Sequence, residues 1–156
     1  MKLIILRHGK AEDHHKDGDH ARRLTSKGHA QAELQAQRLA NIGLLPNLIL
    51  SSPLVRARET AETFASAADI SGPMIQTWLS CGMRPSTALK ELAAYKEFKT
   101  VCIVGHEPDL SSLVASLTGS TASSIQMKKG SLAILEANPP AAHGFLEILL
   151  PPKEGL

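Results

Sequence analysis

Residues 1–10 read MKLIILRHGK, and this stretch combines a short apolar run with a polar end. The run from Leu3 to Leu6 is continuous, which is typical of a strand that is covered on both faces. Arg7 and His8 follow directly. Strict alternation would point these two side chains to opposite faces, so the chain must leave the strand at about Arg7 if both serve one pocket. Gly9 permits that turn because it lacks a Cβ atom.

Two interpretations of this strand end stay open. In the first, Arg7 is a forked hydrogen-bond donor to a phosphate group, and His8 is a nucleophile or a general base. In the second, the strand ends at the protein surface with two incidental polar residues. The choice depends on whether other parts of the chain supply similar groups.

Length and composition restrict the class of protein. A chain of 156 residues is long enough for one domain with a real core, so we predict a single domain over residues 1–156. The net charge of +2 argues against nucleic acid or an anionic membrane as the main partner. No apolar run reaches the length of a membrane span, and residues 2–6 are too short for a signal peptide. Cys81 and Cys102 lack metal-ligand spacing, and we expect a cytoplasmic protein.

Residues 10–24 are polar, and we predict a loop there. Its imidazoles and carboxylates could form a transition-metal cluster, since these groups are common ligands. A solvated loop over the site is the favoured interpretation, because a His-rich tract is only a compositional signal. The loop holds His14, His15, Asp17, Asp19, His20 and Arg22.

The rest of the chain alternates between predicted strands and helices. We expect helices over residues 26–41 with Thr25 as N-cap, over 53–68 with Ser52 as N-cap, over 87–95 with Ser86 as N-cap, and from Leu110 to Gly119. We expect strands at residues 48–50, within 73–79, at 101–104, at 132–135 and at 145–150. Lys128 and Lys129 are assigned no role beyond a solvated edge. The tail 151–156 is expected to be loose.

Two more strand ends carry cationic or ionisable side chains. Arg56 falls in the first turn of a helix, where the helix dipole disfavours a cation and a bound anion would reverse that sign. His106 lies between a strand and a helix N-terminus, which suits a phosphate. Taken singly, Arg56 could be an exposed arginine and His106 a capping or packing residue. In open α/β sheets ligands bind beyond the carboxyl ends of the strands, so together with Arg7 and His8 they indicate one phosphate site.

The ordered set of motifs resembles the signature of the histidine phosphatase superfamily. The motifs are Leu-Arg-His-Gly at 6–9, Ser-Ser-Pro at 51–53, Arg-Ala-Arg-Glu-Thr-Ala at 56–61 and Gly-His-Glu-Pro at 105–108. The short length, the spacing of Asp19, Arg22 and Thr25, and the Gly-His-Glu-Pro form resemble the small phosphohistidine phosphatase branch called SixA. The resemblance implies an α/β fold like that of phosphoglycerate mutase, a three-layer α/β/α sandwich with a mainly parallel central sheet.

The resemblance also implies roles for individual residues. His8 would be the nucleophile, Arg7, Arg56 and His106 would surround the phosphoryl group, and neither a metal nor another cofactor would be needed. Further candidates for phosphate or substrate binding lie in or beside the matching motifs: Gly9, Asp19, Arg22 and Glu107. The implied partner is a histidine-phosphorylated protein or phosphotransfer domain, and we expect the enzyme to act as a monomer.

The chemistry of phosphoryl transfer agrees with these roles. Catalysis is mostly positioning and charge stabilisation, which two guanidinium groups can supply through paired hydrogen bonds. A neutral His8 can attack phosphorus, and its tautomer should be fixed by a hydrogen bond, for which a backbone carbonyl is a candidate. His106 can stabilise the equatorial oxygens if it is cationic.

The chain departs from the wider superfamily at the leaving-group acid. Mutase-like and acid-phosphatase members carry a carboxylate after the second helix, but residues 77–85 contain no Asp or Glu, and the small branch also lacks this acid. Asp19 or Glu107 could substitute for it. Three hypotheses therefore stand: a protein phosphohistidine phosphatase, a phosphatase of small phosphate esters, and a non-catalytic phosphate- or phosphoprotein-binding module. The complete set of Arg7, His8, Arg56 and His106 counts against the third hypothesis, since binding alone needs no nucleophile.

Overall fold

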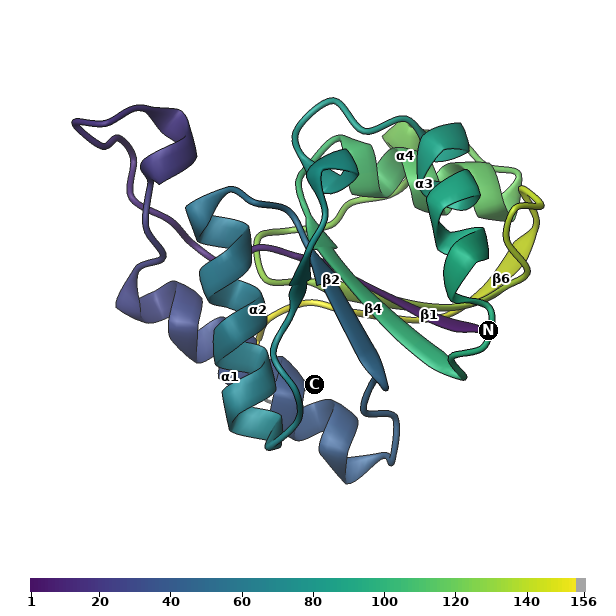
Figure 1. The fold of residues 1–156 in the computed structure, drawn as a ribbon, viewed down its shortest axis with the longest axis horizontal. Coiled ribbons are helices and arrows are strands. Elements are labelled where there is room, and N and C mark those ends of the chain that lie inside the picture. The colour runs from purple at the N-terminus through teal and green to yellow at the C-terminus, as the bar shows by residue number, and fades with distance from the viewer. Residues whose placement is uncertain (154–156) are drawn as a thin grey trace.

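A six-stranded sheet forms the centre of the molecule in the computed structural model, which describes residues 1–153 (Figure 1). Its strands lie in the order β3-β2-β4-β1-β5-β6. Strand β1 pairs in parallel with β4, β4 with β2, and β2 with β3, whereas β5 is antiparallel to both β1 and β6. The strands are β1 (Lys2–Arg7), β2 (Leu48–Ser51), β3 (Met74–Ile75), β4 (Thr100–Gly105), β5 (Leu132–Ala137) and β6 (Gly144–Leu150).

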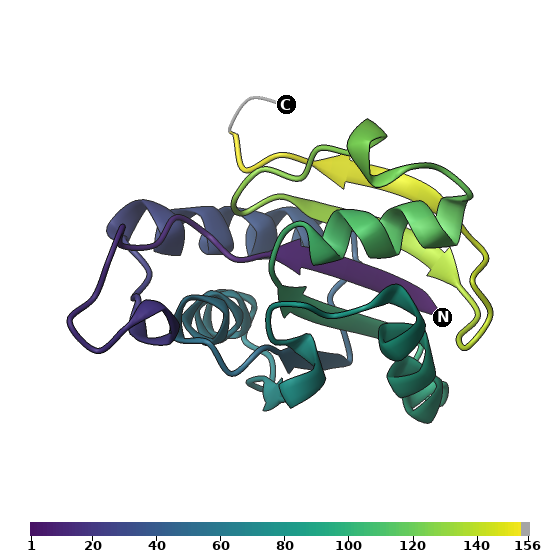
Figure 2. The ribbon, with the colours of Figure 1, turned by 90° about the horizontal axis from the view of Figure 1, so that it is seen from above.

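Helices cover both faces of the sheet, so the predicted three-layer sandwich with a mainly parallel sheet is confirmed. Helices α1 and α2 pack on one face and α3 and α4 on the other (Figures 1 and 2). The α-helices of the described chain are α1 (Ser26–Asn41), α2 (Val55–Ala68), α3 (Pro85–Leu92) and α4 (Asp109–Thr118). Short 3₁₀ turns occur at η1 (Asp19–Ala21), η2 (Thr77–Leu79), η3 (Ala93–Tyr95) and η4 (Ala122–Ser124).

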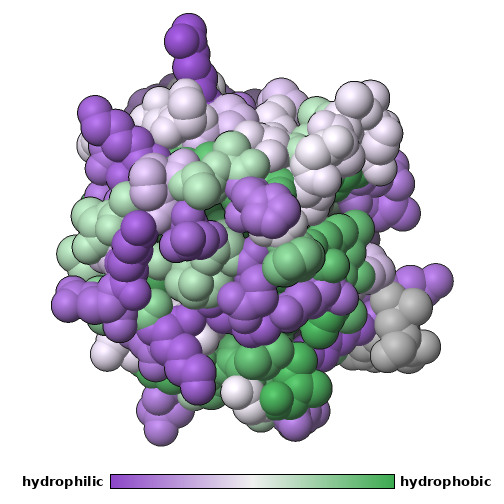
Figure 3. Space-filling view, turned by 90° about the vertical axis from the view of Figure 1, so that its right-hand side faces the viewer, coloured by the Kyte–Doolittle hydropathy of each residue, from purple (hydrophilic) through white to green (hydrophobic). Residues whose placement is uncertain are grey.

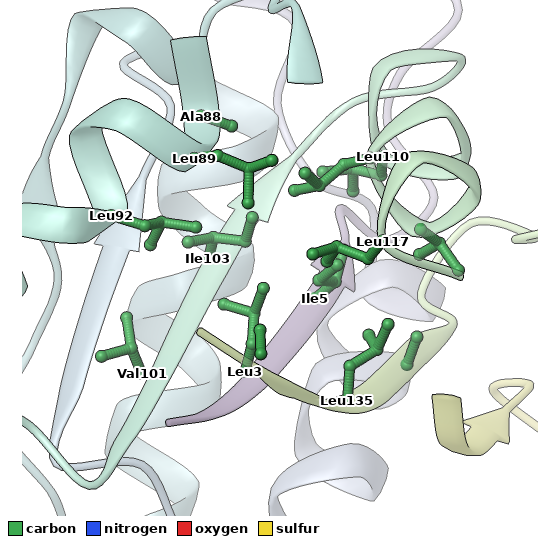
Figure 4. Close-up of a cluster of buried hydrophobic side chains, with 14 of the residues drawn as sticks. Leu3, Ile5, Ala88, Leu89, Leu92, Val101, Ile103, Leu110, Leu117 and Leu135 are labelled. Atoms are coloured by element: carbon green, nitrogen blue, oxygen red, sulfur yellow. The ribbon is translucent and has the colours of Figure 1, made fainter. Parts of the chain in front are cut away.

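The apolar run of β1 divides its side chains between the two layers. Leu3 and Ile5 pack in the cluster beneath α3 and α4, whereas Ile4 and Leu6 pack in the cluster beneath α1 and α2. Figure 4 shows side chains from both helices of the first cluster pointing toward Leu3 and Ile5. The four apolar side chains of β1 are fully buried, and burial of each contributes about 1.5–3 kcal/mol. Burial on both faces explains why this strand is continuously apolar rather than alternating.

Two helix starts differ from the prediction. Helix α2 begins at Val55 with Leu54 as N-cap, because the Ser52 N–H still bonds to the carbonyl of Val104 in the sheet, at 3.0 Å. Helix α3 begins at Pro85, two residues before the predicted start, because proline is well suited to the first helical position. Ser52 and Ser86 are therefore not the N-caps that the sequence analysis assigned.

The chain after β6 is held by α1, contrary to the expectation of a loose tail. Arg38 Nη1 donates to the carbonyl of Pro151 at 2.7 Å, and Arg38 also bonds to the carbonyl of Lys153. For residues 154–156, the prediction of a loose tail lies outside the described residues. Within residues 1–153, no helix combines the length and the apolar character needed to cross a membrane.

Strand β6 forms one edge of the sheet and leaves apolar side chains at the surface. Phe145 is 64 % exposed, and Leu146 and Leu149 are each 40 % exposed. On the side of the molecule that carries β6 and the N-terminus, hydrophobic residues gather in separate patches between hydrophilic ones (Figure 3). The carboxyl ends of the parallel strands β1, β2 and β4 meet at one end of the sheet, where the candidate site is found.

Candidate active site

Strand β1 ends at Arg7, the residue at which the sequence predicts that the chain leaves the sheet. The His8 N–H donates to the carbonyl of Gly105 in β4 at 3.2 Å, and the Gly9 N–H donates to Thr60 Oγ1 in α2 at 3.0 Å. A Cβ atom on Gly9 would lie only 2.7 Å from the carbonyl oxygen of Gly28 in α1. Gly9 is therefore required because the strand end packs closely against the start of α1.

The orientation of His8 is set by its own neighbour in the chain. His8 Nδ1 lies 2.8 Å from the carbonyl oxygen of Gly9. A carbonyl oxygen can only accept a hydrogen bond, so Nδ1 carries the proton and Nε2 keeps its lone pair. This is the backbone hydrogen bond that the sequence analysis expected for a nucleophilic histidine.

His8 is also kept neutral. Burial lowers the pKa of His8 to about 3, and the Gly9 hydrogen bond partly opposes this shift. The neighbouring ring of His106 and the positive charges of Arg56 and Arg7 lower the pKa further. Each of these charges disfavours a second proton on the ring. The ring therefore presents an unprotonated Nε2 at neutral pH.

Arg7 keeps part of its guanidinium group available. Nη1 donates to the carbonyl of Met127 at 2.8 Å, whereas Nε is buried and has no hydrogen-bond partner among the described residues. Burial lowers the pKa of Arg7, and the nearby charge of Glu107 opposes that shift. A buried donor without a partner is costly, and a bound anion would satisfy it.

His106 has the same property on its other ring nitrogen. Nε2 lies 2.8 Å from Ser52 Oγ, and Nδ1 is buried without a partner in residues 1–153. The ring centroid lies 5.3 Å from that of His8. When Ser52 donates its hydroxyl proton to Nε2, Nδ1 carries the ring proton and can donate it to an anion. The structure thus brings two unused donors, on Arg7 and His106, to the neighbourhood of His8.

The charge of His106 differs from the state considered in the sequence analysis. Burial lowers the pKa of His106 to about 4, Arg56 and Arg7 lower it further, and Asp19 opposes the shift. In the free protein His106 is therefore a neutral hydrogen-bond donor. It does not carry the positive charge that the sequence analysis required for its role in stabilising the equatorial oxygens. A bound dianion would raise its pKa by direct attraction.

Arg56 lies in the first turn of α2 and is 6 % exposed. Its Nη1 donates to the carbonyl of Asp19 at 3.0 Å, and its Nη2 donates to the Asp19 carboxylate at 3.2 Å. Cys81 Sγ lies 3.9 Å from the same Nη2. The charge of Arg56 lowers the pKa of both His8 and His106, so Arg56 acts on the same space as the two rings.

Asp19 and Arg22 hold this arginine in place. The Asp19 carboxylate accepts from Arg22 Nη1 at 2.9 Å as well as from Arg56. The Arg22 hydrogen bond is the main reason that the pKa of Asp19 lies below its usual range, and Arg56 contributes to the same shift. Asp19 is therefore ionised at neutral pH and is poorly suited to be the leaving-group acid. Among the described residues, no three His, Cys, Asp or Glu side chains lie close enough to hold one metal ion.

Glu107 is occupied at the start of α4. Its carboxylate accepts from the Ser111 N–H at 2.9 Å and from the Ser111 hydroxyl. This is a capping arrangement for the first turn of the helix. Both candidates for a substitute acid are thus engaged in other interactions.

Sequence reasoning missed two residues that build the site. Ser52 was assigned as a helix cap but bonds to His106, and Asp109 was not singled out. The Asp109 carboxylate accepts from the N–H groups of Gly82 and Met83, at 2.8 and 3.1 Å, and so holds the loop that places Cys81 against Arg56. The position of Ser52 at the end of a strand was a signal that could have identified it. The sequence around Asp109 carries no such signal.

Comparison with known proteins assigns the family. A sequence profile of the histidine phosphatase superfamily (branch 1) matches residues 3–78. An uncharacterized protein of Picosynechococcus sp. is 39 % identical over 141 residues, which cover 85 % of this chain and 82 % of that protein. The chain belongs to the histidine phosphatase superfamily. Membership supports a phosphatase activity.

Two solved structures place this histidine phosphatase within the superfamily. The protein histidine phosphatase SixA in complex with tungstate matches with a TM-score of 0.88 and 24 % identity, over 97 % of each chain. A protein of Agrobacterium tumefaciens assigned as the phosphohistidine phosphatase SixA matches with a TM-score of 0.81 and 27 % identity, over 96 % of this chain and 97 % of that one. The predicted resemblance to the SixA branch is confirmed. His106 lies beyond the profile match, and its place beside His8 comes from the structure.

Proposed function

We propose that this protein is a phosphohistidine phosphatase that removes phosphoryl groups from histidine-phosphorylated proteins through a covalent intermediate on His8. The observation that carries the proposal is the state of His8: its Nδ1 is bonded to the Gly9 carbonyl, and burial lowers its pKa to about 3. A binding module has no need of a neutral, oriented imidazole among three other cationic or ionisable groups. The similarity of this fold to that of the protein histidine phosphatase SixA supports a phosphohistidine protein as the class of substrate.

In the first step, the lone pair of His8 Nε2 attacks phosphorus in line with the leaving group. The new bond joins Nε2 to phosphorus, while the bond between phosphorus and the substrate nitrogen breaks. The ring of His8 becomes cationic as it is phosphorylated, and the Gly9 carbonyl that accepts from Nδ1 stabilises that charge. The free donors of Arg7 and His106 bind the equatorial oxygens, and Arg56 adds positive charge.

In the second step, water attacks the phosphorylated His8. The bond between phosphorus and Nε2 breaks, its electron pair returns to the ring nitrogen, and a proton from the water goes to solvent or to the phosphate product. Inorganic phosphate leaves, and His8 regains the neutral state in which it began. Positive charge on the described side chains supports a reaction without a metal or other cofactor.

The leaving group distinguishes this proposal from a phosphatase of small esters. An alkoxide must be protonated as it leaves, and a positioned acid contributes about 10²–10⁴-fold. Asp19 is held ionised by Arg22 and Arg56, and Glu107 is bonded to Ser111. A phosphohistidine substrate needs no such acid, because its ring can be protonated before the bond breaks and then leaves as a neutral imidazole. We therefore propose a histidine-phosphorylated protein or phosphotransfer domain as substrate, acted on by a monomer.

The test compares kcat/KM for a phosphohistidine protein, an aryl phosphate and an alkyl phosphate. We expect the order phosphohistidine, then aryl, then alkyl, with the alkyl ester at least 100-fold below the aryl ester for lack of an acid (about 10²–10⁴-fold). Rapid quenching at high pH should trap a phosphoryl group on His8. The His8→Ala variant is the control, in which no phosphoenzyme should form. Equal or higher values for the alkyl ester would replace the proposal by the small-ester function. Absence of turnover on all three substrates would favour the binding module.

A further inference from the structure

A second basic feature lies beside the phosphate site. A pocket of about 560 Å³ is lined by Arg7 and by five lysines from four parts of the chain. We call it the lysine pocket and define it by Lys10, Lys27, Lys128, Lys129 and Lys153. The sequence pattern predicts only a solvated edge at Lys128 and Lys129, whereas the fold places them with three other lysines next to a residue of the candidate site.

The walls of the lysine pocket are fixed relative to His8. The Gly130 N–H donates to the carbonyl of His8 at 2.9 Å, which holds the segment after Lys129 against the end of β1. The fully buried Gln35 donates to the carbonyls of Gly130 and Leu150, at 2.9 and 3.1 Å, and so ties together two walls of the pocket. A group bound in the pocket would therefore sit at a defined place relative to a phosphoryl group on His8.

Arg7 is shared between the pocket and the phosphate site. Its side chain lines the pocket, its Nη1 is anchored on the carbonyl of Met127, and its buried Nε has no protein partner in residues 1–153. The two sites are thus adjacent.

The positive charge of the pocket is poorly compensated. None of its lysines forms an ion pair within the described part of the chain. Burial lowers the pKa of Lys129, the charges of Lys10, Arg7 and Arg22 lower it further, and Asp13 opposes the shift. The whole chain has a net charge of only +2, so this concentration of like charge is local. Such a cluster attracts anionic partners and speeds their association.

We propose that the lysine pocket binds acidic side chains of the phosphorylated protein, next to its phosphohistidine. The proposal rests on the proposed function for the nature of the substrate. The shape of the pocket favours a protein surface over a compact ligand: Lys10, Lys27 and Lys128 are exposed, and Pro151 and Pro152 supply apolar contact area. Sites for small ligands instead enclose them with a few buried polar groups. Flexible ammonium groups are suited to carboxylates that approach from solvent.

The experiment uses two phosphohistidine peptides and one enzyme variant. One peptide carries Asp and Glu around the phosphohistidine, and the other carries Asn and Gln in their place. The variant is Lys27→Gln with Lys128→Gln, and the matched control is Lys16→Gln with Lys90→Gln, which changes two exposed lysines outside the pocket.

Two or three exposed ion pairs predict a preference of about tenfold in kcat/KM for the acidic peptide. In the pocket variant this preference should fall to about twofold, because KM for the acidic peptide rises. The rate on an aryl phosphate should stay unchanged.

Binding of a non-phosphorylated Glu-rich peptide, measured by titration calorimetry, separates the pocket from the proposed function. If the enzyme hydrolyses aryl phosphate but neither phosphohistidine peptide, the proposed function fails, while salt-sensitive peptide binding that the pocket variant loses still supports the pocket. Equal turnover of the two peptides by the wild-type enzyme would overturn the inference. If the pocket variant keeps the preference for the acidic peptide, the inference is also overturned. Pyrophosphate serves as a compact anionic ligand in the same titration, and tight binding of pyrophosphate without binding of the peptide would overturn the inference as well.

Discussion

Lowering the pH tests the state of His8 most directly. With an ordinary histidine pKa of about 6.5, only about 3 % of the ring would be neutral at about pH 5, and the reaction would slow about 30-fold. Burial and the surrounding positive charges instead lower the pKa of His8 to about 3 and that of His106 to about 4. Both rings then remain almost fully neutral at about pH 5. The expected loss of activity from the enzyme is therefore less than about twofold.

The assay is kcat/KM for an aryl phosphate between about pH 7 and pH 4.5, because this quantity reports the free enzyme. The ionisation of the substrate is measured separately and divided out. Folded protein must be confirmed by circular dichroism at each pH. The folded-state pKa values lie below those of the unfolded chain, so the unfolded chain binds more protons and stability falls as the pH drops from about 6.5 toward 4. An acid limb with a midpoint near 6.5, in protein that is still folded, would refute the assignment of His8 as a buried neutral nucleophile.

Three further changes and one treatment test the remaining roles. His8→Ala should lower kcat by several orders of magnitude with an unchanged circular dichroism spectrum, and a variant that keeps more than about a tenth of the rate would remove His8 from the mechanism. Ser52→Ala removes the hydrogen bond to His106 Nε2 and should lower kcat about tenfold; an unchanged kcat would show that Ser52 does not set the His106 tautomer. Asp19→Asn weakens the support of Arg56 and should lower kcat/KM by the same factor for aryl and alkyl phosphates, whereas a loss confined to the alkyl ester would identify Asp19 as an acid. Exhaustive chelation should leave activity intact, and a loss that a divalent ion restores would contradict the metal-free mechanism.

Much of the fold was readable because it depends on local pattern. The apolar runs of β1 and β4, the periodicity of α1, α2 and α4, and the polar groups at strand ends all appear within short stretches. Parallel strands share one edge for their carboxyl ends, so Arg7, His8, Arg56 and His106 could be expected to meet there. The start of α2 was misplaced because Ser52 has two suitable partners, a helix N-terminus and a histidine 54 residues away.

The sequence by itself determined the family, the layered architecture and the residues at the strand ends, since each follows from short motifs in a recognisable order. Only the tertiary structure decided the protonation of His8 and His106, the loss of Asp19 and Glu107 as free acids, and the existence of the lysine pocket. These properties depend on burial and on contacts between distant segments: Arg7 bonds to the carbonyl of Met127, 120 residues later in the chain. A pKa or an unused donor is set by everything that surrounds a group, and those surroundings exist only after the chain has folded.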